Sequence, residues 1–345
     1  FVQGSVALAL ILGIPQLVIG LTVVSLGTSA PELFVSVRSV LNGSDTLAVS
    51  NVVGSNIFNV MVVLGSSALV LPLRVESRLV RRDVPLLLAV SAAVWGMASA
   101  GRVTWQAGIA LLIALLINSM WEIRTAREEP EGMEDAEPEI SSQAANNGWQ
   151  KAIISLAAGI VLLGLGSNLL VNGAISAAQL LGVSEVVIGL TIVSAGTSMP
   201  ELITSLVAAI RGRTDLAIGN VVGSSLLNQL LVLGSCALAS GSKGLHVDSL
   251  LIERDLPVMV LTTLACLPIF WTKGRISRLE GGFLLGLYVF YVIDQVLPHT
   301  LPSWQDEFRL TMLCFVLPAV LITIAIQALF YWRHLRQLRI SSGAD

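Results

Sequence analysis

Long apolar runs, each of the length that crosses a lipid bilayer, are the feature of this chain that most limits its fold. A spanning helix requires about 20 mostly apolar residues. Apolar residues make up 54% of the 345 and charged residues only 12%, whereas soluble domains have about 25% charged residues. The chain is therefore predicted to be an all-α polytopic membrane protein, which excludes a soluble enzyme. The candidate spans are 10–38, 46–71, 84–100, 104–122, 151–171, 183–210, 215–240, 256–272, 279–297 and 309–332.

The composition also excludes other classes of protein. The net charge is −3 and the basic residues fall in separate clusters, so nucleic acid is not an expected partner. Cys236, Cys266 and Cys314 form no CxxC motif and lie near no histidine pair, which argues against a disulfide framework or a zinc site. The spans also contain no Ser/His, paired-Asp or HExxH arrangement. An intramembrane hydrolase is therefore not expected, and neither is a bound cofactor.

The distribution of Lys and Arg predicts the orientation in the membrane. If the loop 122–151 is cytoplasmic and the spans alternate from there, 15 of the 20 basic residues lie on the cytoplasmic side. Positive residues concentrate in cytoplasmic loops. We therefore expect a multi-pass cell-membrane protein with this loop and the C-terminus in the cytoplasm, and the short loops indicate a prokaryotic plasma membrane.

An internal repeat divides the chain at a constant offset of 169 residues. LVIGLTVVSLGTSAPELFVSVRS from Leu17 matches VVIGLTIVSAGTSMPELITSLVA from Val186 at 14 of 23 positions. LAVSNVVGSNIFNVMVVLGS from Leu47 matches LAIGNVVGSSLLNQLLVLGS from Leu216 at 12 of 20. Apolar composition alone would not align Gly, Thr, Pro, Glu and Asn without a gap, so the chain contains a duplication.

The repeat predicts the organisation of the whole chain. We expect a first half at 1–122, an acidic cytoplasmic linker at 123–150, a second half at 151–300, and an extra C-terminal helix with a basic tail at 301–345. Phe1 aligns with Leu170, within the end of a span, so we expect the first of five helices in the first half to be largely missing from this chain. Five helices per half invert the second copy, as in secondary transporters.

The linker is unusually acidic, with seven acidic residues among the twelve at 128–139. This composition favours a solvated, disordered tether. A calcium-sensing role is the alternative, although the segment is too short to form a separate regulatory domain.

Glu32 and Glu201 are the carboxylates that lie deep within apolar spans. A charge at a helix centre costs roughly 2.5–3.5 kcal/mol on insertion scales. Because the two glutamates occupy equivalent positions in the repeat, they indicate a cation site between the halves. The alternative interpretation is a protonated glutamate that hydrogen-bonds to a neighbouring helix.

The residues around each glutamate extend this prediction. Pro31 and Pro200 precede the glutamates and cannot donate to the carbonyl four residues back, so each helix should kink and free carbonyl oxygens. Hydroxyl and amide side chains recur at the spacing of one helical face. These further candidates are Thr28, Ser29, Ser55, Asn59, Thr197, Ser198, Ser224 and Asn228. All ten ligands are hard oxygens, which suit Ca²⁺ and Na⁺.

With this paired GTSxPE…NVVGSxxxN motif, the chain resembles the sodium/calcium exchanger superfamily, the cation/Ca²⁺ exchangers with two inverted repeats. The resemblance covers both repeats and implies ten core helices, with the second and third of each half meeting at the ion site. It implies that Glu32 and Glu201 are shared Ca²⁺/Na⁺ ligands, and that the hydroxyl and amide residues above complete the sites. Ca²⁺, Na⁺ and the bilayer are the partners it implies, and it implies no oligomeric state.

Two departures from the family pattern lie in the second repeat. Ser225 follows Gly223-Ser224 where the family usually has Asn, and Asn228 stands where many prokaryotic and all potassium-dependent relatives carry Asp. The expected function is a Na⁺/Ca²⁺ antiporter working by alternating access. A H⁺/Ca²⁺ exchanger of the same fold is the alternative, although proton-coupled relatives typically have Gly-Asn where both copies here have Gly-Thr-Ser. A cation channel is the third possibility.

Overall fold

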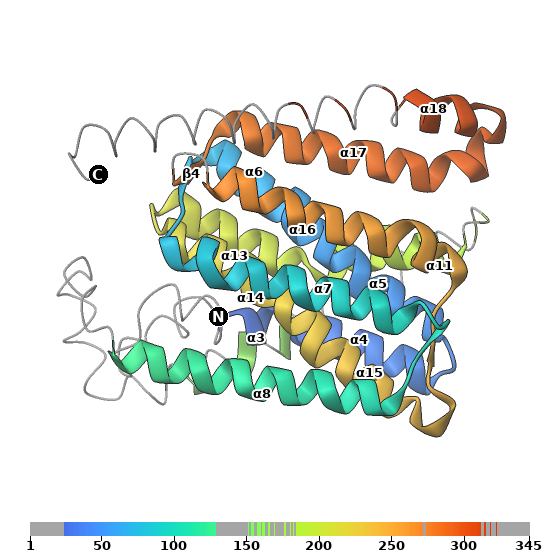
Figure 1. The fold of residues 1–345 in the computed structure, drawn as a ribbon, viewed down its shortest axis with the longest axis horizontal. Helices are drawn as coiled ribbons and strands as arrows, with labels where there is room; N and C mark the ends of the chain where they lie inside the picture. Colours follow the sequence, from blue (N-terminus) through green and yellow to red (C-terminus); the bar gives the residue numbers. More distant parts are fainter. Residues whose placement is uncertain are drawn as a thin grey trace, which may run out of the picture.

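The computed structural model describes residues 24–128, 184–271 and 274–311, with scattered positions between 151 and 182 and between 314 and 322. The predicted linker, most of the predicted spans 151–171 and 309–332, and the beginning of 10–38 lie outside the described residues. The described part is a bundle of long helices joined by short turns (Figure 1), as the apolar runs predict.

The helices of the first half form four groups. They are α3 (Ser25–Thr28) with α4 (Ala30–Leu41); α5 (Asp45–Phe58), η2 (Asn59–Val63) and α6 (Leu64–Val70); η3 (Leu79–Asp83) with α7 (Val84–Ala98); and α8 (Trp105–Glu128). The middle segments η2 and η3 are π-helical turns within longer helices.

The second half repeats this order. Its helices are α11 (Glu185–Ile188), η5 (Gly189–Val193), α12 (Ser194–Thr197) and α13 (Met199–Ile210); α14 (Thr214–Leu227), η6 (Asn228–Leu233) and α15 (Gly234–Ala239); η7 (Gly241–Lys243); η8 (Leu251–Asp255) with α16 (Leu256–Trp271); α17 (Arg278–Thr300); η9 (Pro302–Trp304); and α18 (Gln305–Thr311). Here η5, η6 and η8 are the π-helical turns.

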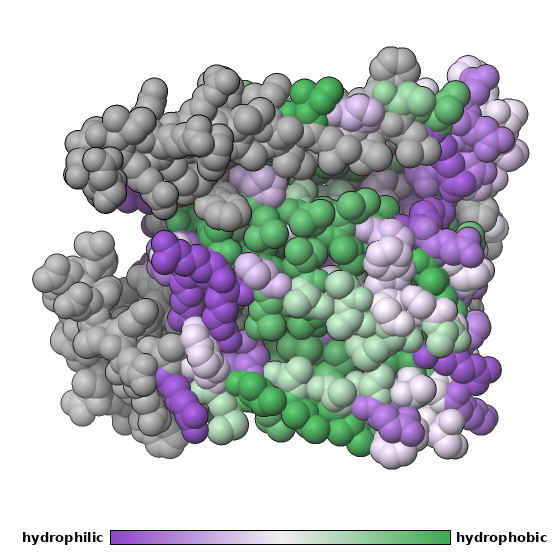
Figure 2. All heavy atoms as spheres, in the orientation of Figure 1, coloured by the Kyte–Doolittle hydropathy of each residue, from purple (hydrophilic) through white to green (hydrophobic). Residues whose placement is uncertain are grey.

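Several described segments are long and apolar enough to cross a membrane. Four of them are Asp45–Val70, Trp105–Glu122, Thr214–Ala239 and Arg278–Pro298, and a fifth is the pair Val186–Thr197 and Met199–Ile210, bent by 45°. These match five of the predicted spans to within a few residues. Hydrophobic side chains fill the middle of the visible surface, with hydrophilic ones gathered toward its two ends (Figure 2), as expected of a protein whose middle faces lipid.

The spans differ in how deeply they are buried. The continuous helices α5–η2–α6 and α14–η6–α15 are almost entirely enclosed, whereas α8 and α17 expose much of their apolar surface. In Figure 1, α8 and α17 lie at opposite edges of the bundle, and α5 and α14 lie between them. The two central helices are therefore shielded from lipid, which is where polar side chains can be accommodated.

Glycine allows the central helices to approach closely. A Cβ atom on Gly54 of α5 would lie 2.6 Å from the Leu190 carbonyl oxygen of η5, and one on Gly189 would lie 2.5 Å from the Ser50 Cβ atom. Such distances are too short for any larger side chain. These small residues let the first-half helix α5 contact the second half backbone to backbone.

Two short antiparallel ribbons join the halves. Strand β1 (Leu73–Arg74) pairs with β4 (Arg275–Ile276), and β2 (Arg102–Val103) pairs with β3 (Leu245–His246). Each ribbon takes one strand from each half. Since η3 and α7 run from β1 to β2, the two ribbons lie at opposite ends of that helix.

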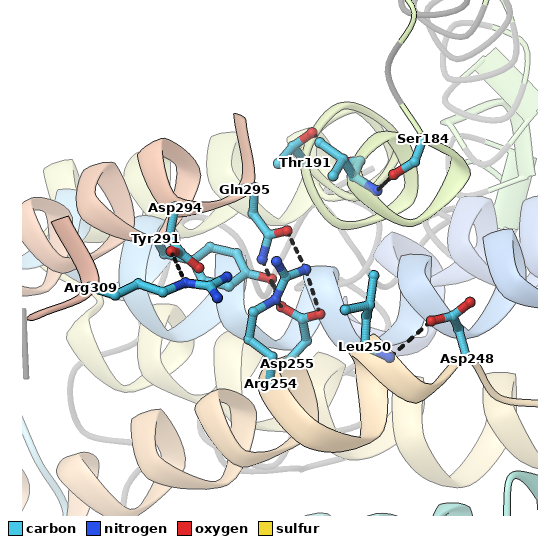
Figure 3. A network of polar contacts seen from close by, with 11 residues as sticks. Ser184, Thr191, Asp248, Leu250, Arg254, Asp255, Tyr291, Asp294, Gln295 and Arg309 are labelled. Carbon is cyan, nitrogen blue, oxygen red and sulfur yellow. Dashed lines mark hydrogen bonds and ion pairs between the residues drawn. The ribbon is translucent and has the colours of Figure 1, made fainter. Parts of the chain in front are cut away.

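A buried polar cluster fastens α16 to α17. The Asp255 carboxylate accepts hydrogen bonds from the Gln295 amide at 2.7 Å and the Tyr291 hydroxyl at 3.2 Å, and it forms an ion pair with Arg254 at 3.0 Å. Arg254 also donates to the Gln295 amide oxygen at 2.6 Å. Figure 3 shows these side chains converging between the two helices. We call this group the α16–α17 cluster.

The equivalent place between α7 and α8 holds a more strongly charged group. Arg82 pairs with Asp83 at 2.7 Å and also with Glu122, and Arg78 pairs with Glu122. Arg82 further donates to the Asn118 amide oxygen at 2.6 Å. In this α7–α8 cluster two arginines face two carboxylates, so its charges balance.

Candidate ion-binding site

Each half contains a helix break immediately before its buried glutamate. Helix α3 ends at Thr28 and α4 begins at Ala30, with Ser29 between them at φ −80° and ψ 2°. Ser198 has φ −86° and ψ 8° between α12 and α13. In both halves proline occupies the first turn of the following helix, where its missing N–H breaks no intrahelical hydrogen bond. The interruption predicted from the Thr-Ser-x-Pro-Glu sequence is confirmed.

The two glutamates are buried completely and are held by residues of the opposite half. Glu32 and Glu201 each have 0% exposed surface. The Ser198 hydroxyl donates to Oε1 of Glu32 at 2.9 Å, and the Ser29 hydroxyl donates to Oε1 of Glu201 at 3.3 Å. Each helix break thus supports the glutamate of the other half, so the two carboxylates belong to one site rather than to two separate ones.

The central helices contribute an amide and a hydroxyl from each half. Asn59 and Asn228 begin the π-helical turns η2 and η6, and Ser55 and Ser224 lie one turn earlier. All four are 0% exposed. The Ser224 hydroxyl lies 3.2 Å from that of Thr28, which belongs to the other half. A π-helical turn in an α-helix commonly marks a functional site, and here it starts at the candidate amide ligand in both halves.

Several polar atoms in this group have no hydrogen-bond partner among the described residues. They are Oε2 of Glu32 and of Glu201, the Ser55 hydroxyl, and the whole side-chain amides of Asn59 and Asn228. A buried polar group without a partner costs free energy. Two carboxylate oxygens, two amide oxygens and one hydroxyl oxygen that lack partners are a donor set that a hard cation would satisfy.

Seven of the ten candidate residues form hydrogen bonds between the two halves: Thr28, Ser29, Glu32, Thr197, Ser198, Glu201 and Ser224. Ser55, Asn59 and Asn228 are buried without such a bond among the described residues. The structure adds a second layer that the sequence reasoning missed. The Thr197 hydroxyl donates to the Asn51 amide oxygen at 3.2 Å, and the Asn51 amide donates to Ser36 at 2.9 Å. The signal was present, because Asn51 and Ser36 recur in the second half at the same offset of 169.

The second half forms the matching network. The Thr28 hydroxyl donates to the Asn220 amide oxygen at 3.3 Å, and the Asn220 amide donates to Ser205 at 2.9 Å and to the Glu201 carbonyl oxygen at 3.3 Å. Each asparagine therefore fixes a candidate threonine from the opposite half.

A neighbouring polar group breaks this symmetry. The Gln229 amide donates to Asn56 at 3.1 Å and to Ser91 at 3.0 Å, whereas the first-half counterpart of Gln229 is Val60. Asn56 in turn donates to the Val52 carbonyl at 2.8 Å. Asn56 therefore links helices of the two halves beside the site.

An oxygen-lined site enclosed by spanning helices defines a membrane transporter of ions. The sequence matches the model of the family "Sodium/calcium exchanger protein" over residues 1–123 and 151–297. The chain belongs to the sodium/calcium exchanger family. Members of this family are antiporters of the cation/Ca²⁺ exchanger type rather than enzymes, and they carry ions as transported substrates without a cofactor.

Curated relatives span most of the chain. The chain is 36% identical to the putative antiporter CaxA of Alkalimonas amylolytica, covering 84% of this chain and 91% of that protein. It is 33% identical to the inner membrane protein YrbG of Escherichia coli, covering 83% and 89%. It is 30% identical to the sodium/calcium exchanger MaX1 of Methanosarcina acetivorans, covering 85% and 92%. The chain is accordingly a multi-pass membrane protein.

Solved structures show the same fold. The sodium–calcium exchanger NCX_Mj, soaked with Na⁺ and Ca²⁺, superposes with a TM-score of 0.68 at 28% sequence identity, covering 85% of this chain and 91% of that one. The same exchanger soaked with Na⁺ and Sr²⁺ gives a TM-score of 0.68 at 29% identity. The predicted all-α polytopic fold is thus confirmed.

Proposed function

We propose that this protein exchanges Na⁺ for Ca²⁺ across the membrane at the site formed by Glu32, Glu201 and the eight hydroxyl and amide residues around them. The crossed contact between the halves carries the proposal. Ser198 of one half bonds Glu32 of the other, Ser29 bonds Glu201, and Oε2 of each glutamate has no partner in the described part of the chain. Two carboxylates balance one divalent ion.

Exchange requires that one site accept either ion but not both at once. Since both ions would use Glu32 and Glu201, a Ca²⁺ ion excludes Na⁺ from the same oxygens. Relatives of this chain support the pair of ions, because MaX1 is named a sodium/calcium exchanger and NCX_Mj was soaked with both.

The architecture supports alternating access through an inverted repeat. Strand β1 precedes the third helix group of its half, η3–α7, and pairs with β4, which precedes the fourth group of the other half, α17. Strand β2 precedes the fourth group of the first half, α8, and pairs with β3, which precedes the third group of the second half, η8–α16. At each end of the bundle, the loop before the third helix group of one half therefore meets the loop before the fourth helix group of the other half. Two halves of opposite orientation require this arrangement. We further propose that the β1–β4 end and the loop 122–151 face the cytoplasm, since Arg74, Arg275 and Arg278 lie at that end.

The deciding experiment is Ca²⁺ flux in proteoliposomes that contain the purified protein. Uptake of ⁴⁵Ca²⁺ is measured with an outward Na⁺ gradient, with an outward proton gradient, and with choline replacing both. We expect uptake only with the Na⁺ gradient, and rising external Na⁺ should inhibit it competitively. Uptake driven by protons alone would identify a H⁺/Ca²⁺ exchanger, and uptake without any counter-ion gradient would identify a channel.

Orientation is tested separately by labelling single cysteines. With Cys236, Cys266 and Cys314 replaced by serine, Arg275→Cys and His246→Cys place one thiol on each ribbon. In intact cells a membrane-impermeant maleimide should label position 246 from outside and position 275 only after the cells are opened. The opposite pattern would reverse the proposed orientation without affecting the ion assignment.

A further inference from the structure

The β1–β4 ribbon places two arginines directly opposite each other. Arg74 and Arg275 are register partners, and both side chains are exposed. Directly opposite residues of an antiparallel pair project from the same face about 5 Å apart, where like charges are destabilising. Neither arginine belongs to a salt bridge among the described residues. Asp215 interacts electrostatically with Arg74, and no carboxylate of the described residues forms an ion pair with Arg275.

A third arginine stands beside this pair. Arg278 is exposed and begins α17, three residues after Arg275, and its guanidinium donates to the Val70 carbonyl oxygen at the end of α6 at 3.2 Å. The nearby Glu280 carboxylate accepts from the Ser277 backbone N–H at 2.7 Å and from its hydroxyl at 2.8 Å, in a capping box. The end of the α6–α17 pair therefore carries an excess of positive charge. We call Arg74, Arg275 and Arg278 the arginine ribbon.

The arginine ribbon lies at the ends of two apolar segments that are long enough to cross a membrane. The spanning segment of α17 begins at Arg278, and that of α6 ends at Val70. Large apolar side chains are exposed directly beside the arginines: Leu279 is 85% exposed, Val70 42% and Leu69 41%. Guanidinium groups at the membrane boundary, next to exposed apolar surface, match the two parts of a phospholipid.

The opposite ribbon offers an internal comparison. There Arg102 faces His246, and its guanidinium donates to the Lys243 carbonyl oxygen at 2.7 Å. The Asp45 carboxylate accepts from the His246 backbone N–H at 3.0 Å. That ribbon therefore holds a single arginine, which donates to a carbonyl oxygen next to its partner strand, whereas β1 and β4 place two arginines directly opposite each other. Of the two described ribbons, only the arginine ribbon has paired like charges that a bound anion would relieve.

We propose that the arginine ribbon is a binding site for an anionic phospholipid, with the headgroup phosphate held by Arg74 and Arg275 and the acyl chains lying along α6 and α17. Arginine presents a planar fork of N–H donors that matches phosphate oxygens. The site is independent of the transported ions, so its test needs no transport assay.

The test is native mass spectrometry of the full chain in detergent, titrated with phosphatidylglycerol or with phosphatidylcholine. The wild type should bind the first phosphatidylglycerol in preference to phosphatidylcholine. The double variant Arg74→Gln/Arg275→Gln should bind it about 30-fold more weakly. The variant Arg74→Lys/Arg275→Lys, which keeps the charge but loses the planar fork, should lie between the two.

The matched control removes two other exposed arginines from the same end, in Arg81→Gln/Arg211→Gln. Arg81 follows β1 in η3, and Arg211 lies in the turn before α14, which packs against β1. This control should change the affinity less than about threefold, because charges outside a direct contact are screened. Equal losses of phosphatidylglycerol affinity in both double variants would show that binding depends on the general positive charge of this surface and not on a specific site. Equal binding of phosphatidylcholine, or full competition by inorganic phosphate, would also overturn the proposal.

Discussion

The two halves of the molecule are nearly identical at the candidate ion site and different in the polar clusters that α7 forms with α8 and α16 forms with α17. At the centre, each half supplies one glutamate, a Thr-Ser break, and a Ser and Asn on the following helix. At the edges, the α7–α8 cluster opposes two arginines with two carboxylates, whereas the α16–α17 cluster uses one Arg–Asp pair with Tyr291 and Gln295. Identity is retained at the proposed ion site.

The difference has a physical origin. A central site made of crossed contacts needs the same donor in both halves, since Ser29 serves Glu201 as Ser198 serves Glu32. The α7–α8 cluster and the α16–α17 cluster each hold together only two helices of one half. Any set of side chains that provides hydrogen bonds to the buried aspartate is therefore sufficient to hold those helices together. The halves could therefore diverge in the clusters and in the ribbons without disturbing the site.

The largest effect on transport should come from changing one of the two equivalent glutamates at the centre, so that the halves are no longer identical there. Glu32→Gln and Glu201→Gln should each reduce Ca²⁺ exchange by at least about 100-fold, because each removes one of the two charges that balance the ion. The measurement is Na⁺-driven ⁴⁵Ca²⁺ uptake, with unfolding temperature as the control for folding. If one variant kept a near wild-type rate, the two glutamates would not be equivalent and the site assignment would be wrong.

The next largest effect, on stability, should come from giving each of the two polar clusters the type of side chain that the other one has. Glu122→Gln leaves two arginines facing one carboxylate, and Gln295→Glu places a second carboxylate against Asp255 with only Arg254 to balance them. Each change should lower the free energy of unfolding by roughly 1–3 kcal/mol, because a buried group loses its partner. Thermal unfolding in detergent measures this. Unchanged unfolding temperatures in both variants would show that the two clusters are interchangeable.

A smaller effect is expected from the second layer. Asn220→Ala and Asn51→Ala each remove the acceptor that holds a threonine of the opposite half, and they should raise the KM for Ca²⁺ by about threefold to tenfold. The maximal rate should fall much less, because both glutamates remain. Ser67→Ala, a buried residue of α6 outside the site, is the control. A loss of maximal rate with an unchanged KM would contradict a role in binding.

The smallest effect concerns potassium. With Asn59 and Asn228 both neutral, the site has charge for Ca²⁺ but none left for an additional cation, so replacing K⁺ by choline on both sides should change the wild-type rate less than about twofold. Asn228→Asp adds the carboxylate that potassium-dependent relatives carry, and it should make the rate sensitive to K⁺. A wild-type rate that collapses without K⁺ would refute this reasoning.

Much of the candidate site could be predicted from the sequence because its residues occur in both copies of the internal repeat. The offset of 169 residues singled out Glu32 and Glu201 and the residues around them, and proline before each glutamate predicted the helix breaks that the structure has at Ser29 and Ser198. Asn51 and Asn220 begin the two copies of the NVVGSxxxN motif, yet they were not predicted as part of the site, since the motif gives no sign of which helix their side chains contact.

The sequence by itself determined the class of fold, the equivalence of the two halves and the identity of the buried carboxylates, because hydropathy and repetition are properties of the chain alone. Only the tertiary structure decided that the serine of each half bonds the glutamate of the other, that π-helical turns begin at Asn59 and Asn228, and that Arg74 faces Arg275. These are contacts between segments up to about 200 residues apart, and no local pattern encodes the crossing of two helices. They depend on packing, which a glycine such as Gly54 permits but does not by itself specify.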